Sequence, residues 1–201
     1  MSKSANDKHQ RVMKKLKAGV DQAIASAHNE RSVVLLLTGD GKGKSSSAFG
    51  MVMRALGYGQ RVAVVQFIKG QQLSGEEIYL RKQHPDLPFY QMGTGFTWDT
   101  QNRDSDIAAA ERTWAIAREH LQNPELDLLV LDELTYMLGF RYLDEQMVLD
   151  SIRDRRPQLS VVITGRGGGS ALRELADTVA EIQDVKHAFR NGVMARKGVD
   201  Y

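Results

Sequence analysis

A glycine-rich turn between an apolar run and a helical pattern places the strongest constraint on how this chain can fold. The stretch LLLTGDGKGKSSS, from Leu35 to Ser47, carries three glycines and two lysines. When an apolar strand ends in such a turn and continues into a helix, unpaired backbone N–H groups converge on one point, and the positive end of the helix dipole adds to them. The sequence therefore predicts a loop that binds polyphosphate.

Short apolar runs and helical patterns alternate along the rest of the chain. Six runs rich in apolar and β-branched residues predict strands, of which the third and the sixth are the weaker candidates, at residues 33–37, 62–67, 88–92, 126–131, 161–164 and 178–182. Apolar residues at helical spacing predict three helices, with stripes that begin at Ala48, Ile107 and Leu143. Buried strands with intervening helices are typical of a parallel sheet that is covered on both faces.

The composition narrows the class of protein. The chain has 201 residues, of which 42% are hydrophobic and 26% charged, and these values fit one soluble domain. A formal net charge of +2 gives no overall footprint for binding nucleic acid, and the lack of cysteine excludes disulfides and thiol catalysis. No run approaches the roughly 18 apolar residues of a membrane span. We therefore expect a cytoplasmic protein with neither a nucleic-acid nor a membrane partner.

The first 30 residues predict an amphipathic helix. Val12, Leu16, Val20 and Ile24 recur at i, i+4 spacing, and the opposite face is rich in lysine. We divide the chain into an N-terminal helical extension, residues 1–30, and an α/β domain, residues 31–201. The extension either docks on the domain with its basic side in solvent or serves as a lid or partner surface, and the sequence leaves both open.

The residue types in the glycine-rich turn suit a phosphate ligand. Gly39, Gly41 and Gly43 allow positive φ and close approach of the backbone to the anion. Lys44 adds a point charge, and the hydroxyl of Ser45 can bind Mg²⁺. The alternative interpretation is a glycine turn that Ser45 merely caps.

The spacing of this turn departs by one residue from the usual pattern G-x-x-x-x-G-K-[ST]. Thr38 stands where the first glycine is expected, the glycine has moved to position 39, and Lys42 adds a second cation. We expect a cradle that is tighter at its entry and holds the nucleotide in a modified way.

A carboxylate pair ends the fourth predicted strand, where LDLLVLDEL places Asp132 and Glu133 after the apolar run 126–131. Burying two carboxylates is costly unless a positive group compensates, and nucleotide-bound Mg²⁺ would do so. Asp132 would hold the metal directly or through water, while Glu133 would assist or act as a base. The alternative interpretation is that the two acidic residues merely mark the start of a helix. With the glycine-rich loop, the pair predicts a single-domain α/β fold of the P-loop NTPase-like, RecA-like type, with a mostly parallel sheet and helices on both faces.

A third stretch, MGTGFTWDTQNRD at residues 92–104, combines two glycines with two aromatic rings. Phe96 and Trp98 are two residues apart and would project to the same side of an extended chain. They serve either as core residues or as a surface for a flat second ligand, because the loop follows a strand at the edge where α/β folds bind ligands.

Weaker signals come from two arginines and a glycine run. Arg54, on the first predicted helix, and Arg166, after the fifth strand, suit phosphate binding, although solvent exposure is the more ordinary interpretation. The run Gly167–Gly169 suits either a second anion loop or a turn. The five histidines show no metal-ligand spacing.

Taken together, these stretches resemble the ATP:cob(I)alamin (corrinoid) adenosyltransferases of the phosphate-loop type, found in bacterial cobalamin synthesis and salvage. The matching segments cover nearly all of residues 32–201 and are TGDGKGKSSSAFG, VAVVQFIKG, GTGFTWDTQNRD, VLDELTYM, VVITGRG, LADTVAEI, DVKHAF and GVDY. The resemblance implies transfer of the 5′-deoxyadenosyl group from ATP to cobalt(I) of a cobalamin or a cobinamide-type corrinoid, with triphosphate as the other product. It also implies that ATP lies in the reverse sense across the loop and exposes its 5′ carbon, which would account for the shifted glycine.

The same resemblance implies roles for particular residues. The triphosphate would be held, with help from Ser46 and Arg54, by Gly39, Asp40, Gly41, Lys42, Gly43, Lys44 and Ser45. Reduced cobalt is itself a strong nucleophile, so the protein needs no attacking side chain of its own. Lys44 and Lys42 would be catalytic because they stabilise the departing triphosphate.

The resemblance further implies a metal site, a corrinoid site and partners. Ser45, Asp132 and Glu133 would bind Mg²⁺, with Mn²⁺ as the alternative ion. Phe96 and Trp98 would line the corrinoid pocket and displace the lower axial ligand of the cobalt. A homodimer and reduced flavodoxin as electron donor are also implied. The chain departs from the family at Ser45-Ser46, where two threonines are common, but the hydroxyls are kept.

Other classes of protein share the loop and the carboxylate pair. A nucleic-acid-dependent ATPase or a small-molecule kinase would act at the γ-phosphate, in the first case with Glu133 activating water. A non-catalytic module would bind ATP without turnover. The near-neutral charge weighs against nucleic acid, and the phosphorus-containing product separates the remaining classes.

Overall fold

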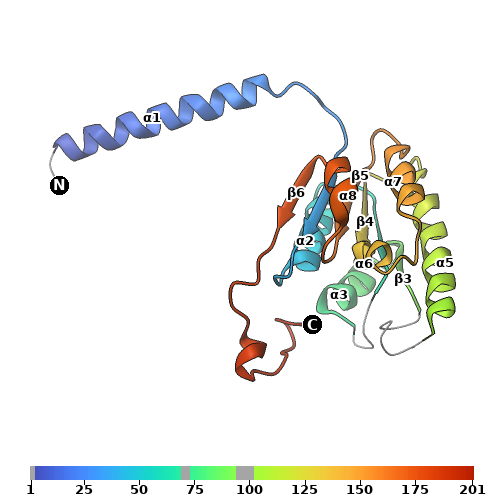
Figure 1. Cartoon of the computed structure of the whole chain (residues 1–201). Helices are drawn as coiled ribbons and strands as arrows, with labels where there is room; N and C mark the ends of the chain where they lie inside the picture. The colour runs from blue at the N-terminus through green and yellow to red at the C-terminus, as the bar shows by residue number, and fades with distance from the viewer. Residues whose placement is uncertain (1–2, 69–72, 94–101) are drawn as a thin grey trace. The chain divides into compact units, whose positions relative to one another are not determined.

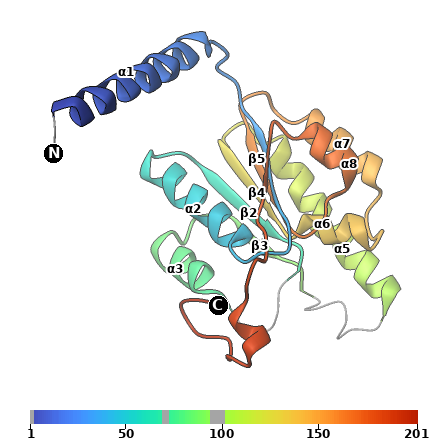
Figure 2. The same ribbon diagram turned by 60° about the vertical axis from the view of Figure 1, so that its left-hand side comes forward.

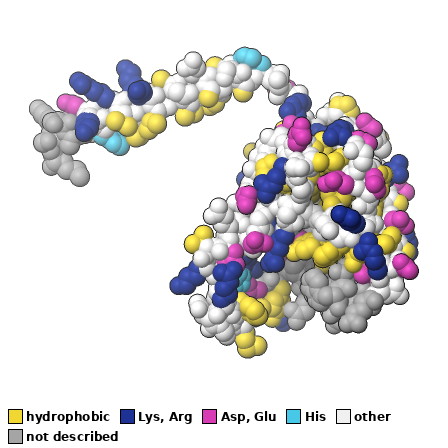
Figure 3. Space-filling model, viewed as in Figure 1, with side chains coloured by type: hydrophobic (Ala, Val, Ile, Leu, Met, Phe, Trp, Pro, Cys, Tyr) yellow, Lys and Arg dark blue, Asp and Glu magenta, His cyan; other side chains and the backbone are white. Residues whose placement is uncertain are grey.

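The structure is a computed structural model, and it describes residues 3–68, 73–93 and 102–201. The chain divides into two compact units, Met1–Arg31 and Ser32–Tyr201. The first contains the helix α1, Lys3–Ser26, which confirms the predicted N-terminal helix. Figure 3 shows hydrophobic side chains along one side of α1. Whether this helix docks or serves as a lid stays a prediction.

The second unit is built on a sheet of six strands in the order β3-β2-β4-β5-β1-β6. All five pairings between neighbouring strands are parallel, as the apolar runs predict. The strands are β1 Val34–Thr38, β2 Val62–Gln66, β3 Phe89–Gln91, β4 Leu128–Asp132, β5 Ser160–Thr164 and β6 Thr178–Glu181. Each lies within two residues of its predicted bounds, so the six strands are confirmed, but β6 is exposed along its length where we expected a buried strand.

Helices cover both faces of this sheet, as Figures 1 and 2 show. On one face, α2 (Lys44–Gly57) and α3 (Gly75–Gln83) pack against the sheet through residues such as Val52 and Leu80. The other face is covered by α5 Arg103–Leu121, α6 Leu134–Gly139, α7 Glu145–Arg153 and α8 Gly169–Leu175. A short 3₁₀ helix, Ala188–Asn191, follows β6. None of the helices in the described ranges is both long and apolar enough to cross a membrane.

Alternate residues of the strands pack into two hydrophobic cores, one on each face of the sheet. Leu36, Val65 and Leu131 point to the core under α5 to α8, whereas their neighbours Leu37 and Val64 point to the core under α2. Both faces of each central strand are therefore buried, in keeping with the nearly continuous apolar character of these strands. The predicted stripe of α5 is confirmed at Ala110, Trp114, Ala117 and Leu121, which are all buried.

The order of the strands positions the candidate site. β5 lies between β1, which leads into the glycine-rich loop, and β4, which carries the carboxylate pair. The carboxyl ends of parallel strands meet at one edge of a sheet, where ligands of α/β folds bind. The loop, the carboxylates and the residues after Thr164 therefore converge.

Candidate functional site

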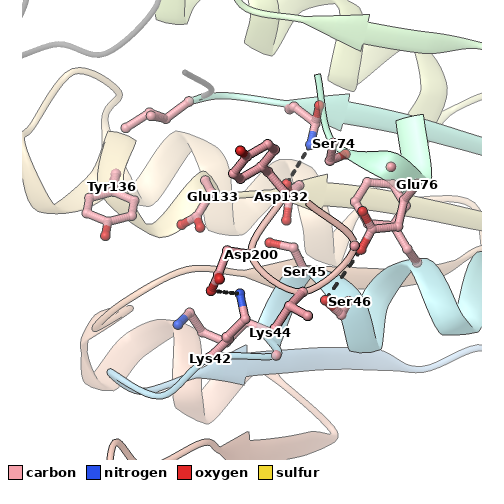
Figure 4. A pocket seen from close by; sticks show the side chains of 18 residues that line it. Lys42, Lys44, Ser45, Ser46, Ser74, Glu76, Asp132, Glu133, Tyr136 and Asp200 are labelled. Carbon is pink, nitrogen blue, oxygen red and sulfur yellow. Dashed lines mark hydrogen bonds and ion pairs between the residues drawn. The ribbon is translucent and has the colours of Figure 1, made fainter. Parts of the chain in front are cut away.

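A cavity of about 590 Å³ opens at this edge of the sheet. Figure 4 shows the loop residues on one side of it and the carboxylate pair on the other. Four segments supply most of its lining, namely residues 42–46 of the loop and α2, Asp132 and Glu133 after β4, residues 74–76 at the start of α3, and residues 198–201. The phenylalanine Phe49 and the tyrosine Tyr136 add aromatic surface.

The loop leads into α2 without a side-chain cap. Gly43 is the N-cap residue, with φ of 119°, and as a glycine it has no side chain to cap the helix. The alternative in which Ser45 caps the turn is therefore wrong, and Ser45 lies within the helix and lines the cavity. Lys44 is 8% exposed and donates from Nζ to the carbonyl of Gly41 at 2.8 Å. Burial lowers the pKa of Lys44, and the carboxylate of Glu133 opposes that effect.

Two glycines of the loop, Gly39 and Gly41, lie against the chain beyond β6. A Cβ atom on Gly39 would lie 2.4 Å from the carbonyl oxygen of Ile182, and one on Gly41 would lie 2.5 Å from that of Gln183. The N–H of Gly41 donates to the carbonyl of Ile182 at 2.7 Å. Backbone therefore lies against backbone at this point, and only glycine fits.

These contacts correct one expectation about the loop. Positive φ occurs at Gly39 and Gly43 but not at Gly41. The small size of Gly39 and Gly41 admits residues 182–183, whereas we expected it to admit the anion. One N–H group of the loop, that of Gly41, is consequently already bonded within the protein.

Asp132 is fixed by hydrogen bonds on both carboxylate oxygens. Its Oδ1 accepts from the hydroxyl of Thr164 at 2.6 Å, and its Oδ2 accepts from Nε2 of Gln66 at 2.8 Å. The residue is 3% exposed. Both partners stand at the carboxyl ends of strands that flank β4 in the sheet, so the fold itself orients this carboxylate.

The bond from Gln66 continues away from the cavity. Oε1 of Gln66 accepts from Nε2 of Gln91 at 3.1 Å, and Gln91 also donates to Oε2 of Glu77 at 3.0 Å. Oε1 of Glu77 accepts from Nε of Arg81 at 2.8 Å, and Glu77 is fully buried. This chain of bonds connects Asp132 to α3, whose first residues line the cavity.

Glu133 is held differently from its neighbour. Its backbone has φ of 60°, and its N–H donates to the hydroxyl of Thr164 at 2.9 Å. Its Oε2 is buried and has no hydrogen-bond partner among the described residues. Although Glu133 is the N-cap residue of α6, its side chain does not cap the helix, so the helix-start interpretation does not explain this carboxylate.

The surroundings of Glu133 perturb its titration. Burial and the charge of Asp132 raise its pKa to about 7, while Lys44 and Arg166 act in the opposite direction. Such a carboxylate is stabilised by a bound cation. The donor set therefore fits Mg²⁺, for which protein sites supply one or two carboxylates and the substrate supplies phosphate oxygens. Over the residues that the structure describes, no group of three or more His, Cys, Asp or Glu forms a cation cage of its own.

Other predicted residues lie in different surroundings. Ser46 lines the cavity and donates to Oε1 of Glu76 at 3.4 Å. Asp40 is exposed, and its carboxylate lies 3.9 Å from Nε of Arg166, so the structure brings that arginine to the loop. Arg54 is exposed in the last turn of α2 and does not line the cavity. Phe96 and Trp98 lie outside the described residues.

Sequence reasoning missed Gln66, Thr164 as a hydrogen-bond partner, and residues 198–201 as cavity lining. A polar residue at the end of an otherwise apolar strand was the available signal for Gln66, because such a side chain must find a partner when buried. For residues 198–201 the sequence offered only the matching segment GVDY, with no indication of where it would lie.

Comparison with known proteins identifies the family of the chain. The family model described as ATP:corrinoid adenosyltransferase BtuR/CobO/CobP matches residues 30–201. The chain is 48% identical over 200 residues to the corrinoid adenosyltransferase of Pseudomonas aeruginosa, covering 100% of this chain and 98% of that protein. It is 45% identical to the corrinoid adenosyltransferase of Escherichia coli and 44% identical to corrinoid adenosyltransferase CobA of Salmonella typhimurium, in each case over 98% of this chain and 100% of the relative. The chain belongs to the ATP:corrinoid adenosyltransferase family.

Proposed function

We propose that this protein transfers the 5′-deoxyadenosyl group of ATP to the cobalt(I) of a corrinoid and releases triphosphate, in adenosylcobalamin biosynthesis and salvage. One observation carries the proposal: in a member of this family, the glycine-rich loop and the carboxylate pair line the same cavity. The loop supplies backbone N–H groups and lysines for the triphosphate, and the pair supplies carboxylates for its metal.

The reaction requires little covalent chemistry from the protein. The electron pair of cobalt(I) forms a bond to C5′, the C5′–O bond breaks, and its electrons leave with the triphosphate, so that cobalt becomes formally trivalent. Lys44 and Lys42 line the cavity and would stabilise the charge that develops on the triphosphate. The other contribution is alignment of the reacting atoms, which the loop provides by fixing the phosphates.

The different surroundings of the two carboxylates support a proposal for the metal site. Both oxygens of Asp132 are already hydrogen bonded, whereas Oε2 of Glu133 is buried without a partner among the described residues. Glu133 and the hydroxyl of Ser45 would therefore hold Mg²⁺ directly, and Asp132 would act through the ordered network behind it. When bound, Mg²⁺ neutralises charge on the phosphates.

The remaining parts of the proposal come from the family. Phe96 and Trp98 would line the corrinoid pocket, and ATP would lie with C5′ toward that pocket. Gly39 to Ser45, with Ser46, would hold the triphosphate. The exposed position of Arg54 at the end of α2 gives no support for its predicted part in ATP binding. We further propose a homodimer and reduced flavodoxin as the electron donor.

One assay separates this function from ATPase or kinase activity at the γ-phosphate. The protein is given ATP, Mg²⁺ and chemically reduced cobalamin under anaerobic conditions, and the absorption spectrum and the phosphorus-containing product are recorded. A light-sensitive cobalt–carbon adduct with inorganic triphosphate supports the proposal. ADP or orthophosphate as the main product, without an adduct, contradicts it.

A further inference from the structure

Residues 198–201 form a compact turn that lines the nucleotide cavity. The N–H of Gly198 donates to the carbonyl of Tyr201 at 2.8 Å, and the N–H of Asp200 donates to the carbonyl of Arg196 at 2.8 Å. The N–H of Arg196 in turn donates to Oδ2 of Asp200 at 2.9 Å. The carboxylate of Asp200 is therefore held in place by the local backbone, and its second oxygen is directed elsewhere.

That second oxygen pairs with the additional lysine of the loop. Oδ1 of Asp200 lies 3.0 Å from Nζ of Lys42, and Figure 4 shows the two side chains pointing toward each other. The hydrogen bond from Arg196 and the pair with Lys42 lower the pKa of Asp200, so this carboxylate is charged at neutral pH. Lys42 is the cation that the shifted loop carries beyond the usual pattern.

This arrangement places the negative charge of Asp200 in a cavity whose proposed ligand, a triphosphate, is itself negatively charged. Like charges at short range oppose each other, so Asp200 and a triphosphate compete for Lys42. Binding of a triphosphate to Lys42 therefore weakens the pair between Lys42 and Asp200. Because the cavity lies open to solvent at Lys42, which is 43% exposed, the exchange requires no opening of the core.

We propose that the 198–201 segment belongs to the nucleotide site and that Asp200 is the counter-ion of Lys42 which the triphosphate displaces. Asp200 thereby lowers the affinity for triphosphate groups and assists release of the triphosphate product by pairing again with Lys42. The statement about product release rests on the proposed function, whereas the statement about affinity does not.

The test measures binding of inorganic triphosphate, and separately of ATP, by titration calorimetry without corrinoid. We expect Asp200→Asn to bind both ligands about two- to fivefold more tightly than the wild type, the range that corresponds to an exposed ion pair. The gain should shrink as salt is raised. It should vanish when Asp200→Asn is combined with Lys42→Ala, because the competition requires Lys42.

Asp150→Asn is the matched control, since it removes one negative charge from an exposed pair with Arg153 on α7, outside this cavity. Unchanged or weaker binding by Asp200→Asn, or an equal gain from Asp150→Asn, would overturn the inference. Thermal melting of each variant checks folding. Adenosyl transfer by the wild type decides the proposed function independently, because the binding comparison involves no corrinoid.

Discussion

Asp132 and Glu133 are adjacent in the sequence, yet their carboxylates meet different surroundings. Thr164 and Gln66 hold both oxygens of Asp132, while Glu133 keeps one buried oxygen without a partner among the described residues. The sequence predicted the pair and its place at the end of a strand. The sequence could not show which of the two carboxylates is free to bind a metal, because the hydrogen bonds to Asp132 come from neighbouring strands.

Glu133→Gln should change how stability depends on pH. The unfolded chain releases this proton near pH 4.5 and the folded chain near pH 7, so the wild type loses stability as pH rises through that window. Without nucleotide or divalent cation, the free energy of unfolding of the variant, relative to that of the wild type, should rise by about 2 to 3 kcal/mol between pH 4.5 and pH 8. Denaturant unfolding at the two pH values measures this. Glu111→Gln, on the exposed side of α5, should show no such gain, and an equal gain there would contradict the assignment to Glu133.

At the scale of elements, the chain beyond β6 shapes the glycine-rich loop. Sequence reasoning recognised that the first glycine was shifted and expected a tighter entry. The cause was not visible, because the contacting carbonyls belong to Ile182 and Gln183, far along the chain. The six strands were predictable from short runs rich in apolar and β-branched residues, whereas α6 and α8 are shorter than the window over which helical periodicity can be read.

Gly41→Ala tests this contact. The new methyl group would meet backbone atoms that cannot move aside cheaply, so we expect a loss of about 1 to 3 kcal/mol in the free energy of unfolding. Triphosphate binding should also weaken. Gly50→Ala is the control, because Gly50 lies in α2 with open space around it and should gain about 0.5 to 1 kcal/mol. Equal stability of Gly41→Ala and wild type would show that the loop and residues 182–183 separate readily.

Gln66→Leu tests the chain of hydrogen bonds between the strands and α3. It leaves Oδ2 of Asp132 buried without its donor, which should cost about 1 to 3 kcal/mol of stability. Metal affinity should fall by about 10- to 100-fold, measured as Mn²⁺ binding in the presence of ATP by electron paramagnetic resonance. Gln122→Leu removes an exposed amide that bonds to the carbonyl of Asp154 and should leave metal binding unchanged. If Gln66→Leu binds the metal as tightly as the wild type does, the proposal that Asp132 supports the metal site is wrong.

At the scale of the whole molecule, one edge of the sheet collects segments that are distant in the sequence. The loop after β1, the pair after β4 and the 198–201 segment line one cavity, and the hydrogen-bond chain ties α3 to it. The alternation of strands and helices made the first two predictable, since parallel strands end at a common edge. The last segment carries no periodicity, so only tertiary structure could place it.

Charge around the cavity is divided between the lysines of the loop and the carboxylates of Glu76, Asp132, Glu133 and Asp200. Figure 3 shows both signs of charge mixed over the face in view, in keeping with a net charge of +2. The cations that face the cavity are instead concentrated in the loop, at Lys42 and Lys44. Positive charge is therefore focused where the triphosphate would bind.

Following the 5′ carbon of ATP tests the central claim most directly. ATP labelled with ¹³C at C5′ is incubated with the protein, Mg²⁺ and chemically reduced cobalamin in the dark, and the label is followed by NMR. The account predicts that the label leaves its phosphate ester and becomes a cobalt-bound methylene, with one inorganic triphosphate formed for each. If the label stays esterified in ADP or AMP while phosphate accumulates, the protein acts at phosphorus and the account is wrong.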